Sequence, residues 1–138
     1  MELYNVQQVL GLKAKIRSQI DLVELGEKGL SKVAASRLAK HLAIGLKGIA
    51  PLLSISERTI QRYSAQKVFG RIVSERIIRI ALVVAKGEEV FGENPFRVWL
   101  KETNKALGGK TPLSLLASDF GIDMALAELH RIEHGIIS

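Results

Sequence analysis

The stretch LKGIAPLLSISERTIQRYSAQK, residues 46–67, predicts two short helices joined by a tight turn. Leu46, Ile49 and Ala50 recur at helical spacing, so they supply the packing face of the first helix. Residues 53–55 make the turn, and Ser56 is a typical N-cap residue for the second helix. This pattern is that of a helix-turn-helix, whose second helix enters the major groove of DNA.

The second helix of this motif turns Ile55 and Ile60 inward and leaves polar side chains on its outer face. Arginine pairs with guanine and glutamine with adenine at base edges, whereas serine and threonine at a helix start reach phosphates. We expect Arg58 and Arg62 to make the main DNA contacts, within the set Ser56, Arg58, Thr59, Gln61 and Arg62. The alternative is an ordinary solvated helix surface. Pro51 is expected to shorten or kink the first helix.

The charges divide the chain into two unlike halves. Residues 1–70 hold 11 Lys and Arg against 5 Asp and Glu, and residues 71–138 hold 9 against 9, so the whole net charge of +6 lies in the first half. A basic half suits phosphate, and a neutral half suits another kind of partner. We therefore expect a DNA-binding domain over residues 1–70 and a second small domain over residues 71–138.

The composition is that of a folded protein with a core, since 47% of the 138 residues are hydrophobic and 25% are charged. The absence of cysteine excludes disulfide bonds and thiolate metal sites. The first residues lack the basic and apolar regions of a secretory signal. The apolar stretch at residues 77–85 is interrupted by Arg79 and is far shorter than the roughly 20 residues that span a bilayer. We expect a cytoplasmic protein with no membrane partner.

Apolar residues recur at spacings of three and four along most of the chain, which predicts an all-α fold. We expect one helix over residues 6–20, a second from an N-cap at Ser31 to about Ile44, and a long buried helix that opens at Ser74. Joints are expected at residues 92–95, at Gly108-Gly109 and at Gly121. The side chains expected to face inward are Val9, Ile16, Ile20, Val33, Leu38, Leu42, Ile77, Ile78, Leu82 and Val84.

Two motifs in the second half resemble sites of enzymes without meeting their requirements. The segment NKALGGKT, residues 104–111, has Asn104 where a P-loop requires glycine, and a helix is expected before it instead of a strand. The segment HRIEH, residues 130–134, has the H-x-x-E-H order of inverted zinc peptidases. A catalytic zinc needs a third protein ligand, and His41 is the one other histidine of the chain. We expect no enzymatic activity, no cofactor and no metal.

Several motifs of the second half recur together as the pattern of a family. They are Phe91-Gly92, Phe96, Trp99-Leu100, residues 104–109, Pro112-Leu113, Leu115-Leu116 and residues 131–135. This set resembles the pattern of the Xre/MbcA/ParS-type antitoxins. The segment ISERTIQR at residues 55–62 and the sequence of residues 22–42 also resemble that family, so the likeness covers most of the chain. One departure is Thr103, where the family often has proline before the asparagine.

The resemblance implies an antitoxin of a RES-Xre type II toxin-antitoxin system. Such a protein has an Xre-like helix-turn-helix domain, which dimerises and represses its own operon, and a small helical domain that binds a RES-domain toxin, an enzyme that attacks NAD. The extreme C-terminus approaches or blocks the NAD pocket of the toxin. The toxin contacts implied for this chain are Arg131, Glu133, His134, Gly135, Ile136, Ile137 and Ser138.

Two readings of the second half remain beside the toxin-binding one. Residues 131–134 also fit a surface helix end with ordinary side-chain pairs. A stand-alone helix-turn-helix regulator, whose tail only forms oligomers, is the alternative function. Trp99, Phe91 and Phe96 are expected in the core and not at the toxin interface.

Overall fold

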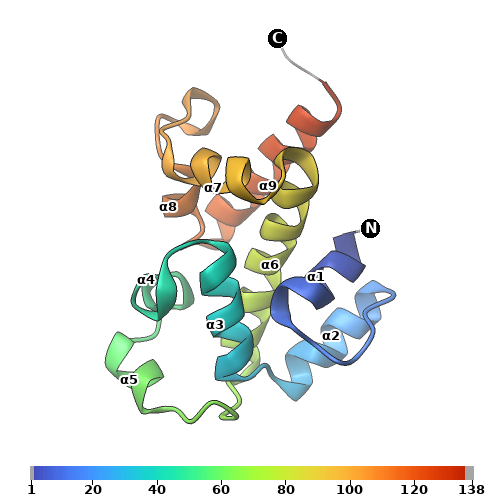
Figure 1. Ribbon diagram of the computed structural model, residues 1–138, viewed down its shortest axis with the longest axis vertical. Coiled ribbons are helices and arrows are strands. Elements are labelled where there is room, and N and C mark those ends of the chain that lie inside the picture. Colours follow the sequence, from blue (N-terminus) through green and yellow to red (C-terminus); the bar gives the residue numbers. More distant parts are fainter. Residues whose placement is uncertain (1, 136–138) are drawn as a thin grey trace.

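Helices joined by short loops make up the computed structural model, which describes residues 2–135 (Figure 1). Within that range there is no strand, and the bridges Ser31–Val68 and Asn104–Lys110 are isolated. The expected all-α fold is confirmed. The elements are α1 (Glu2–Leu10), α2 (Gln19–Lys28), α3 (Lys32–His41), α4 (Gly45–Leu53), α5 (Glu57–Arg62), α6 (Arg71–Phe91), α7 (Glu93–Lys101), the 3-10 helix η1 (Lys105–Leu107), α8 (Pro112–Leu115) and α9 (Asp119–Glu133).

The 21-residue helix α6 is the element around which the others pack, and it contacts α1, α2, α3, α4, α7 and α9. Ile77, Ile80 and Val84 are fully buried, so the expected long central helix is confirmed. Its expected start at Ser74 is wrong, because the helix begins at Arg71. The buried Ser74 hydroxyl instead accepts a hydrogen bond from the Leu30 N–H at 2.9 Å and donates one to the Phe69 carbonyl at 3.2 Å.

The single helix expected over residues 6–20 is wrong. The chain leaves α1 at Gly11, which has a φ of +67°, and α2 begins only at Gln19. Val9 and Ile16 are buried as expected, but Ile20 lies on the outer side of α2 and is 60% exposed. The apolar residues keep their helical spacing across the loop after Gly11, so the pattern predicted one continuous helix. Glycine in the left-handed region ends a helix even where the apolar pattern continues.

Helix α3 begins after the expected N-cap Ser31 and ends at His41, three residues before the expected end. Ala43, with a φ of +58°, turns the chain toward α4. Leu38 and Leu42 are fully buried as expected, whereas Val33 is 42% exposed. The prediction for Val33 is wrong, because its side chain lines the shallow pocket between α3 and the loop after α5. Only its backbone N–H reaches that loop, at 3.2 Å from the Ala65 carbonyl.

Three joints were expected in the second half, and the structure confirms one of them in full. Gly92 (φ +87°) alone separates α6 from α7, so the first joint is shorter than the expected residues 92–95, because α7 begins at Glu93. Gly108-Gly109 (φ +72° and +77°) follow η1, so that joint is confirmed. Gly121 does not break the chain, since it lies inside α9. A Cβ at Gly121 would lie 1.8 Å from the Leu115 carbonyl oxygen, so this glycine allows α9 to approach the end of α8.

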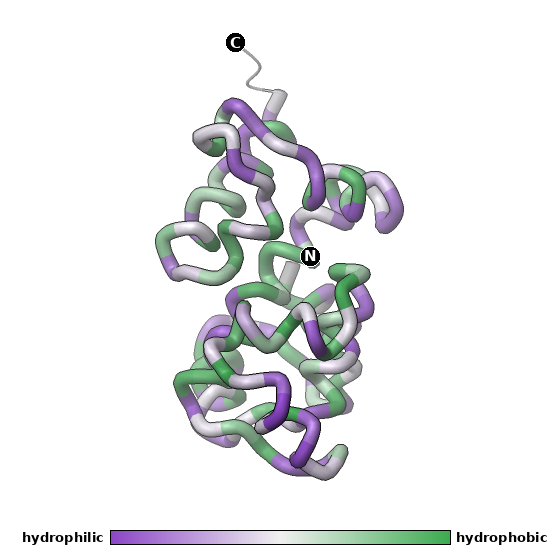
Figure 2. Tube along the Cα trace, turned by 90° about the vertical axis from the view of Figure 1, so that its left-hand side faces the viewer, coloured by the Kyte–Doolittle hydropathy of each residue, from purple (hydrophilic) through white to green (hydrophobic). Residues whose placement is uncertain are grey.

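The helices form two lobes along the long axis. Helices α2 to α5 lie toward one end and α7 to α9 toward the other, and α6 passes through both (Figure 1). Figure 2 shows hydrophobic segments in each lobe and where the lobes meet. One cluster of buried side chains runs from Val6 through Ile77 to Leu129, so both lobes share a core. Within residues 2–135, no helix is both long and apolar enough to cross a membrane.

Candidate functional site

Helices α4 and α5 and the turn between them have the arrangement that the sequence predicts. Ser54 adopts the left-handed conformation (φ +57°) at the end of α4. The Ser56 hydroxyl then caps α5 by accepting a hydrogen bond from the Thr59 N–H at 3.0 Å. Ile60 is fully buried and holds α5 against the core. The turn is therefore fixed by a cap on one side and an apolar anchor on the other.

Pro51 lies in the last turn of α4, where it is exposed. The helix continues through Leu53, so the proline does not stop it early, and the turn begins at Ser54, one residue later than expected. The Ile55 N–H donates to the Ala50 carbonyl at 3.1 Å, which closes the end of the helix across the proline.

The five residues expected to contact DNA are all exposed on α5 or at its start. The Ser56 and Thr59 hydroxyls bond to each other at 2.8 Å, and the Gln61 amide donates to the Glu57 carboxylate at 3.1 Å. Arg58 and Arg62 are four residues apart, so they point from the same face of the helix. The structure thus brings the two arginines together and gives the other three side chains local partners.

A basic surface on α3 extends this region beyond the residues expected from the motif. No Asp or Glu lies between Glu27 and Glu57, although that stretch holds five Lys and Arg. A shallow pocket is lined by Lys32, Ser36, Arg37 and Lys40 of α3 and by Ala65 of the loop that follows α5. The Lys32 Nζ also donates to the Tyr63 carbonyl at 2.9 Å, which ties α3 to the end of α5. The uninterrupted basic run was the sequence signal for this surface.

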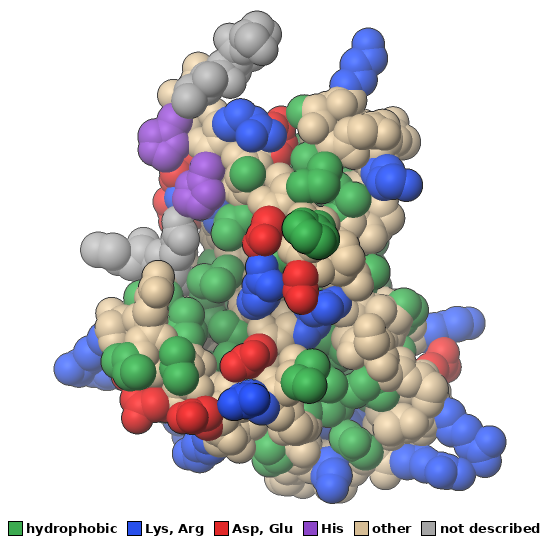
Figure 3. Space-filling model, turned by 180° about the vertical axis from the view of Figure 1, so that it is seen from behind, with side chains coloured by type: hydrophobic (Ala, Val, Ile, Leu, Met, Phe, Trp, Pro, Cys, Tyr) green, Lys and Arg blue, Asp and Glu red, His purple; other side chains and the backbone are tan. Residues whose placement is uncertain are grey.

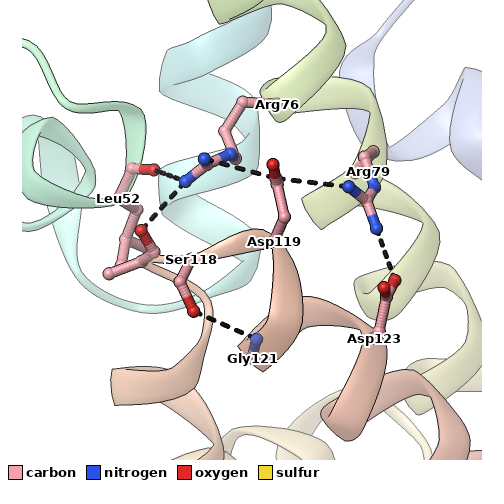
Figure 4. A network of polar contacts seen from close by, with 8 residues as sticks. Leu52, Arg76, Arg79, Ser118, Asp119, Gly121 and Asp123 are labelled. Atoms are coloured by element: carbon pink, nitrogen blue, oxygen red, sulfur yellow. Dashed lines mark hydrogen bonds and ion pairs between the residues drawn. The ribbon is translucent and has the colours of Figure 1, made fainter.

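Two arginines of α6, Arg76 and Arg79, connect this helix to the end of α4 and to the start of α9. Arg76 of α6 donates to the Leu52 carbonyl at 3.1 Å and to the Ala117 carbonyl at 3.0 Å, and it lies 3.3 Å from the Asp119 carboxylate (Figure 4). Arg79 pairs with Asp119 at 3.2 Å and with Asp123 (Figure 4). Arg76 therefore joins α4 to the start of α9.

Helix α7 makes a similar connection to the end of α3. Arg97 donates from its Nε to the His41 carbonyl at 3.1 Å, and Lys101 donates to the Ala43 carbonyl at 3.1 Å. Positive side chains are favourable at a helix C-terminus, where backbone carbonyls lack partners. Nothing in the local sequence pattern indicated these contacts, because the partners are more than 50 residues apart.

The C-terminal end of α9 is fixed to α6 by an ion pair. Lys86 of α6 is only 4% exposed, and its Nζ lies 2.6 Å from the Glu133 carboxylate. This hydrogen bond from Lys86 is the main reason that the pKa of Glu133 lies below its ordinary value. Glu133, expected at the toxin interface, thus has a partner within the chain and positions the helix end.

The other residues expected at the toxin interface lie around this helix end. Arg131 is exposed and pairs with Glu128 at 2.7 Å, as the surface-helix reading would also have it. The His134 Nδ1 lies 2.8 Å from the His130 carbonyl, and Gly135 follows with a φ of +67°. Ile136, Ile137 and Ser138, expected to complete the set, lie outside the described residues.

The segment at residues 104–111 has the surroundings that argued against a P-loop. Helix α7 precedes residues 104–111, and Thr111 caps the four-residue helix α8, so the strand and long helix of a P-loop are not found there. His130, Glu133 and His134 offer three ligand atoms within 4.8 Å of one another. However, the Lys86 ammonium already occupies the cation position beside Glu133.

The aromatic residues of the second half lie in or against the core. Phe96 is fully buried and stacks on Trp99, with ring centroids 6.0 Å apart. Phe91 and Trp99 are half-buried, 5.7 Å apart, and packed against the core. The expectation is confirmed for Phe96. An aromatic residue that the sequence argument missed, Phe120 of α9, is 85% exposed.

Comparisons with known proteins match the two lobes separately. Residues 21–82 match the antitoxin Xre-like helix-turn-helix domain, and residues 86–135 match the antitoxin Xre/MbcA/ParS C-terminal toxin-binding domain. A chain from the crystal structure of the M. tuberculosis MbcT-MbcA toxin-antitoxin complex has a similar fold, with a TM-score of 0.60 and 23% identity over 78% of this chain and 95% of that one. No curated protein matches the chain.

Proposed function

The chain belongs to the Xre/MbcA/ParS antitoxins, and we propose that it neutralises a RES-domain toxin that consumes NAD and represses its own operon by binding operator DNA. It is an antitoxin with a helix-turn-helix domain and a toxin-binding domain. The match of residues 86–135 to the toxin-binding domain is the observation that carries the proposal. In this proposal the chain binds its partners and catalyses no reaction.

For the toxin, we propose that the end of the chain from Arg131 onward approaches or blocks the active site. The Lys86–Glu133 pair supports this, because it holds the last turn of α9 in a fixed place on α6. A tail that starts from a fixed helix end loses less conformational freedom on binding than one that starts from a frayed helix. Glu133 then acts by positioning the tail, and the residues after it act on the toxin.

The toxin part is tested by the rate at which the purified toxin consumes NAD in the presence of increasing antitoxin. A variant that lacks residues 136–138 retains the Lys86–Glu133 pair, so it removes the tail without loosening α9. We expect this variant to bind the toxin and to inhibit it less than the full chain does. Equal inhibition by both chains would show that the tail does not act at the active site.

For DNA, we propose that α5 contacts base edges or backbone phosphates of the operator through Arg58 and Arg62, with Ser56, Thr59 and Gln61 beside them. Both arginines are exposed on one face of a helix whose position is fixed by the buried Ile60. The cations on α3 provide a neighbouring surface for backbone phosphates. A homodimer within the toxin-antitoxin complex would present two such helices to a symmetric operator.

The DNA part is tested by gel shift on the promoter fragment of the chain's own operon at several salt concentrations. Arg58→Ala and Arg62→Ala should each weaken binding and lower the salt slope by about 0.9 if the residue contacts a phosphate. Lys105→Ala and Lys110→Ala are matched controls, since these exposed cations lie in the loop of the other lobe. Unchanged affinity in both arginine variants would exclude α5 as the recognition helix.

A further inference from the structure

Helix α9 leaves a large aromatic side chain on its outer face. Among the hydrophobic side chains that the structure describes, Phe120, at 85%, and Ile72, at 82%, have the highest exposure. Met124, one turn after Phe120, is 43% exposed. Figure 3 shows hydrophobic side chains exposed among cations and carboxylates on one side of the molecule. An exposed aromatic residue beside a methionine is typical of protein interfaces.

Phe120 and Met124 belong to a stripe that reaches the proposed toxin site. Residues 120, 124, 127 and 131 are spaced by four, three and four, so they share one face of α9, and all four are exposed. They are Phe120, Met124, Ala127 and Arg131. The opposite face, with Ile122, Ala125 and Leu129, is buried in the core. At about 1.5 Å per residue, the stripe is roughly 16 Å long.

The charged side chains that flank this stripe have partners within the chain. Asp123 pairs with Arg79 on one side, and Glu128 pairs with Arg131 on the other. The apolar centre of the stripe, Phe120 and Met124, is therefore bordered by charges that are already neutralised. A partner can cover Phe120 without desolvating an unpaired carboxylate, which is the usual penalty at an interface.

The start of α9 is held rigidly, so Phe120 is presented in a fixed place. The Ser118 hydroxyl accepts a hydrogen bond from the Gly121 N–H at 3.0 Å, and Gly121 lies against the Leu115 carbonyl. Arg76 and Arg79 both contact Asp119, the residue before Phe120. A side chain on a fixed stretch of backbone binds with a smaller loss of conformational entropy than one on a mobile segment.

We propose that this stripe, Phe120–Met124–Ala127–Arg131, is part of the docking surface for the toxin, with Phe120 inserted in an apolar recess of that protein. The inference rests on the proposed function and extends it from the end of the chain to the whole outer face of α9. The toxin is the occupant because the stripe lies within residues 86–135, the toxin-binding match, and is continuous with Arg131. Ile72 lies outside that match.

The test measures the affinity of the purified toxin for the full-length chain and for the variants Phe120→Ala and Met124→Ala. Phe120→Ala should weaken binding at least about tenfold, as central aromatic contacts do, and Met124→Ala should weaken it less. Ile72→Ala is the matched control, because it removes an equally exposed side chain from outside the toxin-binding match, and its affinity should stay within about twofold of the wild type. Thermal melts should agree for all four chains, because exposed side chains contribute little to stability.

Each outcome decides between defined possibilities. If the wild type binds the toxin and Phe120→Ala binds it equally well, the stripe is not the docking surface, while the proposed function stands. If the wild type binds no toxin, the proposed function and this inference both fail. If Phe120→Ala changes the mass of the antitoxin alone in light scattering but not its affinity for the toxin, the stripe is a contact between copies of the chain, which also overturns the proposal.

Discussion

Replacing Arg76 with alanine should destabilise the protein far more than replacing Arg79, although both arginines lie on α6 and both pair with Asp119. Arg76 donates to the carbonyls of Leu52 and Ala117, and its side chain is 20% exposed. The partners of Arg79 within residues 2–135 are two carboxylates, which are 63% and 65% exposed. The two variants therefore compare bonds that hold helix ends with ion pairs at the surface.

The magnitude for Arg76 follows from the three interactions that are lost. A hydrogen bond from a charged donor contributes about 1.5 to 3 kcal/mol when it is buried, and less when one partner is exposed, as at Ala117. The ion pair with the exposed Asp119 contributes about 0 to 1 kcal/mol. We expect Arg76→Ala to lower the free energy of unfolding by about 3 kcal/mol and Arg79→Ala by at most about 1 kcal/mol.

Urea unfolding followed by circular dichroism measures this difference, and a thermal melt gives a second estimate. The unfolding entropy of a 138-residue chain is about 0.3 kcal/mol per degree, so Arg76→Ala should lower Tm by about 10 °C. Arg76→Lys should lie between the wild type and Arg76→Ala, since one shorter ammonium cannot replace both the nitrogen that bonds the two carbonyls and the nitrogen that pairs with Asp119. Equal losses in Arg76→Ala and Arg79→Ala would refute the argument that the carbonyl bonds join the lobes.

Two further changes test the position of α9. Gly121→Ala should destabilise the chain by roughly 1 to 3 kcal/mol, because its Cβ would meet the Leu115 carbonyl. Gly70→Ala is the control, since there is open space around Gly70. Equal stability of the two variants in urea unfolding would contradict the close approach of α9 to α8. The pKa of Glu133 is lowered in the folded chain, so its pairing with Lys86 stabilises the fold above the ordinary pKa of 4.5 and is lost as the pH falls through the lower, folded value. The wild type should therefore lose more stability than Glu133→Gln on acidification from about pH 5 to pH 3, and parallel pH curves would show that the pair does not fix the helix end.

The sequence was most informative where one local pattern was enough. The helix-turn-helix was predicted with its turn at residues 53–55 and its cap at Ser56, because the cap, the turn and the inward Ile60 lie close together along the chain. The exposure of the polar outer face of α5 followed from the same helical spacing of apolar residues. Helical spacing alone was misleading over residues 6–20, where Gly11 ends α1 and the apolar residues continue through a loop.

The contacts between residues far apart in the sequence were not predictable from local pattern. Ser74 was expected to cap a helix, but its hydroxyl bonds to the backbone of Leu30, 44 residues away. Glu133 was expected to face a partner, and it also pairs with Lys86, 47 residues away, within the chain. A short polar or charged residue has the same sequence signature whether it caps, pairs or binds a partner, so only the fold distinguishes these roles. Phe120 was missed because a periodic apolar residue is usually assigned to the core.

The most direct test of the central claim is co-expression of the full-length chain with the open reading frame beside its gene, scored by growth and by co-purification. If this chain is the antitoxin of that neighbour, expression of the neighbour alone should stop growth, and the full chain should restore growth and co-purify with it. A neighbour that is harmless alone, or toxic without rescue and without a complex, would contradict the pairing proposed here and favour a stand-alone regulator.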